Sequence, residues 1–462
     1  MIDAGPVVMM RGEARLGWQA MEASEAPSTA IDVAVIGGGP AGSAVSAFLA
    51  RLGRRVALIE KSRHPRFHVG ESLLPSNLPI LERLGVSEAV AAIGRYKPGA
   101  EFVSPHHEQR QVFPFADALN PSPDHAYNVT RAEFDELLLR HAAAAPGVDL
   151  WEGYTATGAE RLPDGWRLTL RGENAPAEIR ARFLIDASGR DGFFAKVESV
   201  RQRSPRHNSA AIFAHFRDVS SDAWAADGSI AIYWFEHGWI WMIPLRNGLT
   251  SVGAVSMPDY LKTRKGPLDA FFIETLKMCP KAWTVLQNAS RVSPVRGAGN
   301  YAYTAKKAFG DGYLLLGDAY TFLDPIFSSG IYFAMQSAER AAEAVNVVLD
   351  RPELAGRLFS RYQRELDNAM ARLTWFIYRF NSPILRNLFM KPRNFFAIRK
   401  AVVSILAGDV YRGGTLSLRL AVFKTIFHLS RLANLRTDRE DRRRREVLPS
   451  ISLPDNEIAD RL

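Results

Sequence analysis

The chain has 462 residues, of which 47% are hydrophobic and 23% are charged, an ordinary composition for a folded protein with a sizeable core. No apolar run reaches the roughly 20 residues that a membrane helix needs, and a single cysteine, Cys279, excludes an intramolecular disulfide and a cysteine-based metal cluster. The net charge of +9 is compatible with a nucleotide, an acidic protein partner, a nucleic acid or an anionic membrane. We expect a bacterial cytoplasmic protein without a membrane span.

The first predicted elements form a βαβ unit. The run IDVAVI at Ile31–Ile36 is rich in β-branched residues and ends at a glycine, which is typical of a buried parallel strand. A helix is predicted over Ala41–Leu52 with Gly53 at its C-terminus, followed by a second strand over Arg55–Ile59. Residues 1–30 lack the pattern of a secretory signal, and we expect them to be a mobile extension.

Later segments predict the rest of this sheet and a second one. Buried strands are expected near Ala181–Ile185 and near Tyr313–Leu316. Four strands of an antiparallel sheet are predicted between them, at Ala210–Phe216, Ser229–Phe235, Trp239–Ile243 and Leu249–Val255. A helix over 331–349 and mainly helical sequence over 356–435 follow.

Gly37, Gly39 and Gly42 form the pattern G-x-G-x-x-G directly after the first strand. The first glycine permits a tight turn, the second lets a diphosphate approach the backbone, and the third permits close packing of helix on sheet. The free N–H groups of the helix N-terminus then face the diphosphate. Glu60 ends the second strand, where its carboxylate can accept hydrogen bonds from ribose hydroxyls. This order of elements predicts a dinucleotide site.

Two later stretches indicate FAD rather than NAD. Asp186-Ala187-Ser188-Gly189 and Gly317-Asp318-Ala319 each follow a predicted strand, and Asp324-Pro325 comes shortly after the second. This arrangement resembles the second FAD signature of the p-hydroxybenzoate-hydroxylase-like flavoproteins. The resemblance implies that Asp318 holds the ribityl and pyrophosphate region, that amides of residues 328–330 face the flavin ring, and that Arg131 lies along the flavin. The predicted cofactor contacts are Gly37, Gly39, Ala41, Gly42, Glu60, Lys61, Arg131, Asp186, Gly317, Asp318, Pro325, Ser329, Gly330 and Ile331.

These elements predict an α/β fold, α+β overall, in which a Rossmann-like FAD-binding domain carries an inserted antiparallel-sheet substrate domain and a helical C-terminal region. The predicted parts are an N-terminal extension (1–30), a discontinuous FAD-binding domain (31–200 and 290–350), the substrate domain (201–289), the helical region (351–435) and a basic tail (436–462).

Three further motifs together resemble the flavin-dependent halogenases. They are Gly70-Glu71-Ser72, the run WIWMIP from Trp239 to Pro244, and DPIFSSG from Asp324 to Gly330, and the similarity spans roughly residues 31–410. In that family the W-x-W-x-I-P strand is thought to keep the flavin from acting as an ordinary monooxygenase, although isoprenoid reductases have a similar strand. The resemblance implies FADH₂, O₂ and chloride or bromide as reactants, with halide at Ser329 and Gly330. It also implies a substrate tunnel lined by Glu71, Ser72, Trp239, Trp241, Pro244 and Phe327.

Lys97 matches the position of the essential lysine of the halogenases, a short way after the G-E-x motif. The family's flavin converts halide to hypohalous acid, which must then be steered to the substrate. An ammonium group can hydrogen-bond and polarise that acid, or a neutral amine can trap it as a haloamine. Burial would lower the lysine pKa and favour the second route. A surface lysine beside a Pro-Gly turn is the structural alternative.

The sequence departs from the tryptophan halogenases at Phe327, where those enzymes have a glutamate that assists the lysine. The form DPxFSSG looks more like the branch that acts on electron-rich phenols or pyrroles, often tethered to an acidic carrier protein. A second nicotinamide motif is missing, because Gly297-Ala298-Gly299 follows Arg296 rather than an apolar strand. We therefore expect a separate flavin reductase to supply FADH₂.

Three functions stay open at this stage. The first is an FADH₂-dependent halogenase of secondary metabolism that uses Lys97, as a monomer or homodimer. The second is an NAD(P)H-dependent hydroxylase or an ene-reductase of the same fold. The third is a flavin-binding scaffold in a biosynthetic assembly. The ten histidines form no metal-binding pattern, and no nucleic-acid partner is expected.

Overall fold

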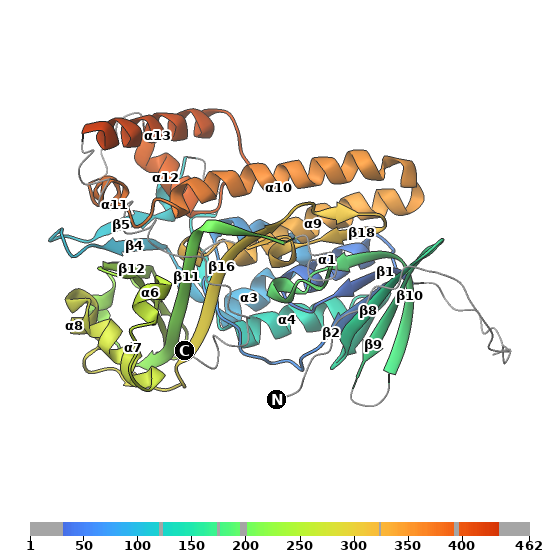
Figure 1. The fold of residues 1–462 in the computed structure, drawn as a ribbon, viewed down its shortest axis with the longest axis horizontal. Coiled ribbons are helices and arrows are strands. Elements are labelled where there is room, and N and C mark those ends of the chain that lie inside the picture. The colour runs from blue at the N-terminus through green and yellow to red at the C-terminus, as the bar shows by residue number, and fades with distance from the viewer. Residues whose placement is uncertain are drawn as a thin grey trace.

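The computed structural model describes residues 31–119, 123–172, 176–194, 201–322, 325–391 and 397–433. The chain forms two large sheets side by side, with long helices across both of them (Figure 1). The predicted extension 1–30 and the whole predicted basic tail, 436–462, lie outside the described residues.

The first sheet is built on parallel strands whose carboxyl ends lie at one edge. Its order is β17 (Phe309–Gly310), β18 (Tyr313–Leu315), β10 (Pro176–Asp186), β1 (Ile31–Ile36), β2 (Val56–Glu60) and β7 (Val148–Glu152), with β8 (Thr155–Leu162) and β9 (Gly165–Arg171) attached to β10. The predicted strand β1 is confirmed at both ends, and β2 and β18 agree with their predictions to within one residue at each end.

The second sheet contains the four predicted antiparallel strands and several others. Its order is β19 (Thr321–Phe322), β16 (Arg296–Ala305), β11 (Arg201–Arg217), β14 (Thr250–Ser256), β13 (Gly238–Pro244), β12 (Ile230–Phe235), β4 (Gly99–Val103) and β5 (Gln111–Pro114), with β15 (Ser290–Arg291) on β11. The sheet therefore extends beyond the predicted range 201–289. Strand β4 pairs in parallel with β12 across more than 120 residues of sequence, a pairing that local patterns do not encode.

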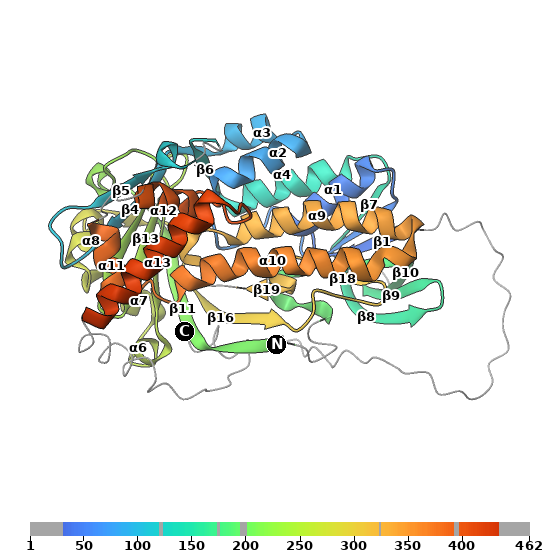
Figure 2. The ribbon, with the colours of Figure 1, turned by 90° about the horizontal axis from the view of Figure 1, so that it is seen from above.

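The helices divide between the two sheets. Helices α1 (Pro40–Arg51), α4 (Arg131–Ala143) and α9 (Gly330–Asp350) pack together beside the first sheet, and α10 (Ala355–Ile377) runs alongside α9 (Figure 2). The remaining helices are α2 (Leu78–Leu84), α3 (Ser87–Ile93), α6 (Pro258–Leu261), α7 (Leu268–Lys277), α8 (Pro280–Leu286), α11 (Pro383–Met390), α12 (Ile398–Leu406) and α13 (Thr415–Ala433). Among the described residues, no helix has the length and apolar character needed to cross a membrane.

One hydrophobic core joins the first sheet, the inner face of the second sheet and the C-terminal helices. A smaller core lies on the other face of the second sheet, beneath α7 and α8. Strand β13 separates the two, because its side chains alternate: Trp239 and Trp241 face the large core, and Ile240 and Met242 face the small one. The two tryptophans of the WIWMIP run thus face the side on which the C-terminal helices lie.

Candidate active site

The glycine loop joins β1 to α1 at the carboxyl edge of the first sheet. Gly37 has a φ of +106°, and a Cβ on it would lie 2.4 Å from the Ala187 carbonyl oxygen. A Cβ on Gly42 would lie 1.8 Å from the Gly37 oxygen. Both positions therefore require glycine, because the helix start, the loop and the strand β10 end touch backbone to backbone. This is the close approach that the G-x-G-x-x-G pattern predicts.

The N-terminus of α1 is suited to an anion. Its cap, Gly39, makes no side-chain hydrogen bond to the first turn, and that turn contains no acidic residue. A Cβ added to Gly39 would meet only the Arg66 guanidinium, at 3.6 Å, so the space in front of this residue is open. Free N–H groups, the positive end of the helix and a nearby arginine match the needs of a diphosphate. The chain thus fits FAD at this edge.

Glu60 and Lys61 end β2 beside the loop but differ in their surroundings. Glu60 is 4% exposed, and its two carboxylate oxygens accept hydrogen bonds from the amides of Gly38 at 2.6 Å and Ser62 at 2.8 Å. Each oxygen retains a lone pair with which it can accept a ribose hydroxyl. Lys61 is exposed and forms an ion pair with Asp191. Glu60 therefore also shapes the loop itself, a role that the sequence pattern does not indicate.

Arg131 is the first residue of α4 and is 6% exposed, so its side chain is buried rather than on the surface. Its guanidinium donates to both carboxylate oxygens of Asp135, at 2.7 and 2.8 Å, and to the Val69 carbonyl at 2.9 Å. Burial raises the pKa of Asp135, but the charges of Arg131 and Arg66 outweigh burial and hold it below its usual value. Arg131 and burial together lower the pKa of His68 to about 4.

The cluster of Arg66, His68, Arg131 and Asp135 packs against the segment that precedes Glu71. Its members Arg66 and Asp135 were not predicted from the sequence. Asp135 follows Arg131 by four positions on one helix, a spacing that could have indicated the pair. Arg66 reaches Asp135 at 3.3 Å from a loop, and nothing in the local sequence indicates that contact.

The two later aspartates occupy different environments. Asp186 at the end of β10 is fully buried, and its carboxylate accepts hydrogen bonds from the Ser188 amide at 3.0 Å, the Ser188 hydroxyl at 2.5 Å and the Phe194 amide at 2.9 Å. It holds the loop that faces Gly37. Asp318 is partly exposed in the short turn Gly317–Ala319 after β18, and its carbonyl accepts a hydrogen bond from the Tyr303 hydroxyl at 2.7 Å.

The loop before α9 completes this edge. Pro325–Phe327 forms a single helical turn, and Ser328 has a φ of +54°. Ser329 caps α9 without a side-chain hydrogen bond to its amides, and a Cβ on the exposed Gly330 would meet nothing within 4 Å. Ile331 is buried at the start of α9. Asp324 of the predicted motif lies outside the described residues.

Lys97 ends the short strand β3 (Arg95–Lys97), which pairs with β6 (Ala126–Asn128), and it is fully buried. Its ammonium donates to the Ser72 hydroxyl and to the Leu73 carbonyl, both at 2.8 Å, and lies 5.1 Å from the centre of the Phe115 ring. Burial lowers the pKa of Lys97 to about 7, so the neutral and charged forms are both populated near neutral pH. The surface-lysine alternative is therefore wrong.

A narrow cavity lies between Lys97 and the loop before α9. Its volume is about 10 Å³, close to the space that one water molecule needs. Apart from Lys97 and Ser328 its lining is apolar: Leu74, Ala100, Phe102, Phe115, Ile230, Ile232, Ile326, Phe327 and Leu406. A small reactive molecule in this cavity would meet one amine, one serine and otherwise apolar side chains.

Of the predicted tunnel residues, Phe327 lines this cavity, whereas Trp239, Trp241 and Pro244 do not. Phe327 is 4% exposed and packs edge-on against Phe376 and Phe380. Trp239 contacts Phe380, and the Trp241 indole donates to the Ser251 hydroxyl at 3.2 Å. Trp239 thus packs against Phe380, and neither tryptophan lines the cavity. Pro244 ends β13, and its carbonyl accepts a hydrogen bond from Asn128 at 3.1 Å.

Glu71 forms a contact that the sequence analysis missed. Both of its carboxylate oxygens lie 3.0 Å from Nε2 of His215, a residue of β11 in the second sheet. Glu71 is 4% exposed and directly precedes Ser72, the residue that accepts from Lys97. The pair therefore fixes the Gly70-Glu71-Ser72 segment against the second sheet. No metal-binding group of side chains occurs among the described residues.

The parallel sheet, the glycine loop and the anion-accepting helix start define a dinucleotide-binding flavoprotein fold, and comparisons with known proteins agree. A family profile described as an FAD binding domain matches residues 30–374. The 1H-pyrrole-2-carbonyl-(peptidyl-carrier protein) chlorinase of Pseudomonas fluorescens is 30% identical over 414 residues, which cover 84% of this chain and 91% of that protein. The chain belongs to the flavin-dependent halogenases, an FAD-dependent family of oxidoreductase type.

Solved structures show the same relationship. The crystal structure of CmlS, a flavin-dependent halogenase, is similar with a TM-score of 0.72 and 32% identity, covering 86% of this chain and 70% of CmlS. A flavoprotein/dehydrogenase from Cytophaga hutchinsonii is similar with a TM-score of 0.80 and 28% identity, covering 87% of this chain and 100% of that one. The predicted fold class and family are confirmed.

Proposed function

We propose that this protein is an FADH₂-dependent halogenase that delivers hypohalous acid to an electron-rich aromatic substrate at Lys97. The observation that carries the proposal is the fully buried Lys97 amine at the end of a narrow apolar cavity, whose other side is formed by Ile326, Phe327 and Ser328 of the loop before α9. This loop is the segment in which we expect the flavin contacts Pro325, Ser329, Gly330 and Ile331.

Reduced FAD, when bound, would supply two of the four electrons that reduce O₂, and the halide ion would supply the other two, so that the products are hypohalous acid and water. The chain's residues would hold the other reactants. The amides at Ser329 and Gly330, at an α9 start without a side-chain cap, are suited to a halide ion. The apolar lining would exclude bulk water, so that the acid is not lost before it reaches Lys97.

At Lys97 two routes stay open, as burial lowers its pKa to about 7. In the first, the ammonium donates a hydrogen bond to the oxygen of the acid and makes the halogen more electrophilic. In the second, the neutral amine takes the halogen, and water leaves. In either route the aromatic carbon takes the halogen and loses a proton. Ser72 and the Leu73 carbonyl fix the amine for both routes.

The substrate that fits best is a phenol or a pyrrole on an acidic carrier protein. A relative that is 30% identical is named as a chlorinase of a carrier-bound pyrrole. Phe327, buried at the cavity, places an aromatic ring where the tryptophan halogenases have a glutamate. A separate reductase would supply FADH₂, since Gly297–Gly299 lies within strand β16 and does not open a helix.

The test is a halogenation assay with chemically reduced FAD, oxygen and either chloride or bromide. The substrates are a free electron-rich phenol and a carrier protein loaded with 1H-pyrrole-2-carbonyl. We expect halogenated product from the wild type and none above background from Lys97→Ala, with normal FAD binding in both. Equal product from both proteins would show that Lys97 has no role.

A second candidate function is supported by the similarity to the Cytophaga hutchinsonii flavoprotein/dehydrogenase. An enzyme of that kind would oxidise NAD(P)H or another reductant directly and would turn over without halide. Measuring NADPH consumption in the absence of any reductase, with and without bromide, separates the two functions.

A further inference from the structure

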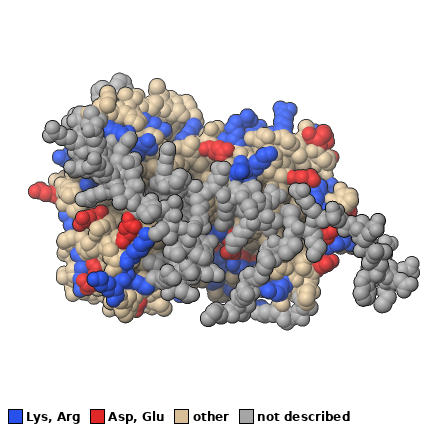
Figure 3. Space-filling view, viewed as in Figure 1, with Lys and Arg blue, Asp and Glu red and all other residues tan. Residues whose placement is uncertain are grey.

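The positive charge of this protein is concentrated in its C-terminal helices. Residues 370–433 contain eleven of the 58 Lys and Arg but only one of the 49 Asp and Glu, Asp409. The rest of the chain has one more acidic than basic residue, so this segment accounts for the whole net charge of +9. In Figure 3 the visible surface of these helices, at upper left, is mostly tan and blue beside the grey atoms.

The outermost of these helices also exposes an apolar stripe. Leu418, Leu429 and Leu432 of α13 are 68%, 59% and 63% exposed, and they are three of the eight large hydrophobic residues exposed in the described part of the chain. Their spacing of 11 and 3 residues places them on one face of the helix. The opposite face of α13 is buried through Leu416, Leu420, Phe423 and Phe427. Helix α13 is therefore apolar on two sides, and one side faces outward (Figures 1 and 2).

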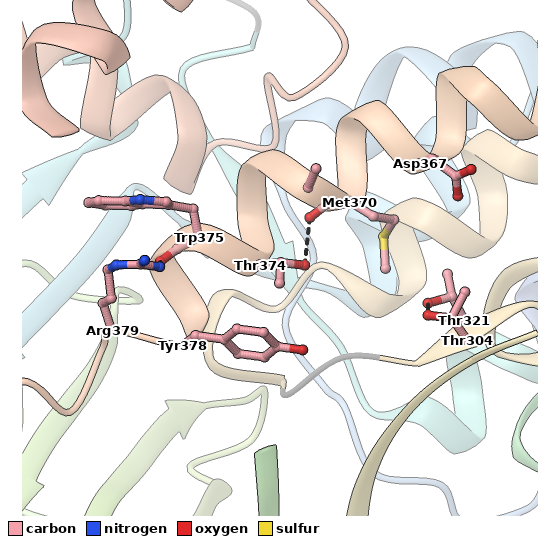
Figure 4. Close-up of a pocket in the computed structure, with 9 residues that line it drawn as sticks. Thr304, Thr321, Asp367, Met370, Thr374, Trp375, Tyr378 and Arg379 are labelled. Atoms are coloured by element: carbon pink, nitrogen blue, oxygen red, sulfur yellow. Dashed lines mark hydrogen bonds between the residues drawn. The ribbon is translucent and has the colours of Figure 1, made fainter. Parts of the chain in front are cut away.

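A cavity of about 390 Å³ lies between the C-terminal part of α10 and the edge of the second sheet. Trp375 of α10 and Arg379, two residues after the end of α10, lie at one end of the cavity, and Thr304, Thr321 and Asp367 lie at the other (Figure 4). The Lys424 ammonium of α13 lies 5.3 Å from the centre of the Trp375 ring, and the Arg379 guanidinium lies 4.7 Å from it. The mouth of this cavity thus joins the basic surface of α13.

On the inner side of α10, the residue next to the cavity lining contacts the surroundings of Lys97. Phe376, which directly follows Trp375 on α10, packs edge-on against Phe327 with ring centres 6.4 Å apart. Phe327 lines the narrow cavity that contains Lys97. A layer of aromatic rings therefore separates the two cavities. A substrate in the larger cavity would lie on the other side of this aromatic layer from Lys97, while a carrier stayed outside.

We propose that the outer face of α13, together with Arg379 and Lys424 at the cavity mouth, is the docking surface for an acidic carrier protein. The larger cavity would admit the flexible arm that bears the substrate. This inference rests on the proposed function. An acidic protein fits best because basic residues flank an apolar stripe, the arrangement of a protein interface with a central hydrophobic patch and a charged rim. A nucleic acid would leave the leucines unused, since its surface is polyanionic.

The test compares carrier binding with chemistry on a free substrate. The variants are Leu429→Glu with Leu432→Glu, which places negative charge on the stripe, and Arg419→Glu, which reverses the charge of the α13 residue next to Leu418. Leu52→Glu is the matched control, because Leu52 is an exposed leucine beside α1, 45% exposed. The probe is an acidic peptidyl carrier protein loaded with 1H-pyrrole-2-carbonyl. Its Kd is measured by fluorescence anisotropy at low and high salt, and product formation is measured with this carrier and with a free phenol.

We expect the double variant to weaken carrier binding at least about tenfold and Arg419→Glu a few-fold, with the wild-type affinity falling as salt rises. Turnover of the free phenol and FAD binding should match the wild type in every variant. Unchanged carrier affinity in the double variant would overturn the docking surface.

Two other results would also overturn it. The first is a change of oligomeric state by sedimentation: if the wild type is a dimer, the double variant is a monomer and carrier affinity is unchanged, the stripe forms the dimer interface of this protein. Halogenation of the free phenol without detectable carrier binding would reject the carrier but retain the halogenase. If the wild type halogenates neither substrate under any condition, the proposed function itself fails.

Discussion

The glycine loop and the Lys97 cavity are built in different ways. The loop is a backbone structure: four glycines within six residues allow strand, turn and helix to touch, and the groups that it offers to a cofactor are main-chain amides. The Lys97 cavity is a side-chain structure to which segments near residues 74, 100, 115, 230, 326 and 406 contribute. The first site presents main-chain groups, whereas the second contains a single amine.

This difference determines how each site tolerates change. A backbone site fails when an added atom forces its elements apart, and most of its side chains can be exchanged. A side-chain site fails when its one functional group is removed, although the fold remains. Variants at the two sites test that contrast.

The largest effect is expected for Lys97→Met. Methionine is similar in length and apolar, so it fits the buried position but can neither donate to hypohalous acid nor take its halogen. We expect halogenation to fall by about three orders of magnitude or more, in the range typical of a lost acid–base group. FAD binding should be unchanged, because Lys97 lies in β3 rather than in the glycine loop. Product formation and flavin absorbance are measured on the same preparation.

Thermal unfolding is the control, because the burial of Lys97 has a stability cost. The pKa of Lys97 is about 7 in the folded protein and has its ordinary value of 10.5 in the unfolded chain. Between pH 7 and pH 10.5 the unfolded chain therefore binds one more proton than the folded protein. The stability of the wild type should therefore rise with pH across this window, and the cost near pH 7 is of the order of 4 kcal/mol. Lys97→Met should not unfold at a lower temperature than the wild type. A marked loss of stability would mean that the inactivity reflects misfolding.

The second largest effect is expected for Gly42→Ala. A Cβ at this position would lie 1.8 Å from the Gly37 oxygen, so helix α1 must move away from the loop that holds the diphosphate. We expect FAD affinity to fall roughly a hundredfold, about 2.7 kcal/mol, as measured by fluorescence titration of the apoprotein. Gly356→Ala is the matched control: it lies in helix α10, nothing is within 4 Å of its added Cβ, and it should stabilise the protein by up to about 1 kcal/mol. Equal FAD affinity in the two variants would refute the close-approach argument.

The contrast also explains what could be predicted from the sequence. The glycine loop was predicted nearly in full, because its spacing, strand and helix are all local in sequence. Lys97 was predicted only by its place relative to Gly70-Glu71-Ser72, and its burial could not be inferred from a residue beside a Pro-Gly turn. The partners of the amine, Ser72 and the Leu73 carbonyl, come from a segment more than 20 residues away.

The rest was missed for the same reason. His215 contacts Glu71 across 144 residues, and Leu406 reaches the cavity from a helix near the end of the described chain. The second sheet was predicted as residues 201–289, but β4 and β16 join it from either side because strand partners are set by tertiary packing. The predicted Trp239 and Trp241 are buried as expected of a core strand, yet they back the cavity rather than line it.

A smaller effect is expected for Ser72→Ala. The Ser72 hydroxyl accepts a hydrogen bond from the Lys97 ammonium at 2.8 Å and so stabilises its charged form. Its loss should lower the pKa of Lys97 further, by about one unit, the size of a hydrogen bond to a charged group. The limb of the pH–activity profile that reports Lys97 should therefore move to lower pH. Ser72→Thr retains the hydroxyl and should keep the wild-type profile.

The same profile separates the two routes at Lys97. If the ammonium acts, wild-type activity falls as the pH rises through about 7, and Ser72→Ala loses activity at neutral pH. If the neutral amine acts, wild-type activity falls as the pH drops below about 7, and Ser72→Ala retains activity in more acidic solution. A profile that does not move in Ser72→Ala would show that the observed limb belongs to another group.

The smallest effect is expected for Glu60→Gln, and it returns to the backbone site. The carboxylate accepts from the Gly38 and Ser62 amides, and glutamine can replace only one of these acceptors, because its other end is a donor. One lost hydrogen bond is worth about 1 kcal/mol, so FAD should bind roughly fivefold more weakly. Glu160→Gln, on the outer strand β8, is the control and should bind FAD as the wild type does. Because the amides and glycines are unchanged, a loss as large as that of Gly42→Ala would show that the site depends on this side chain rather than on its backbone.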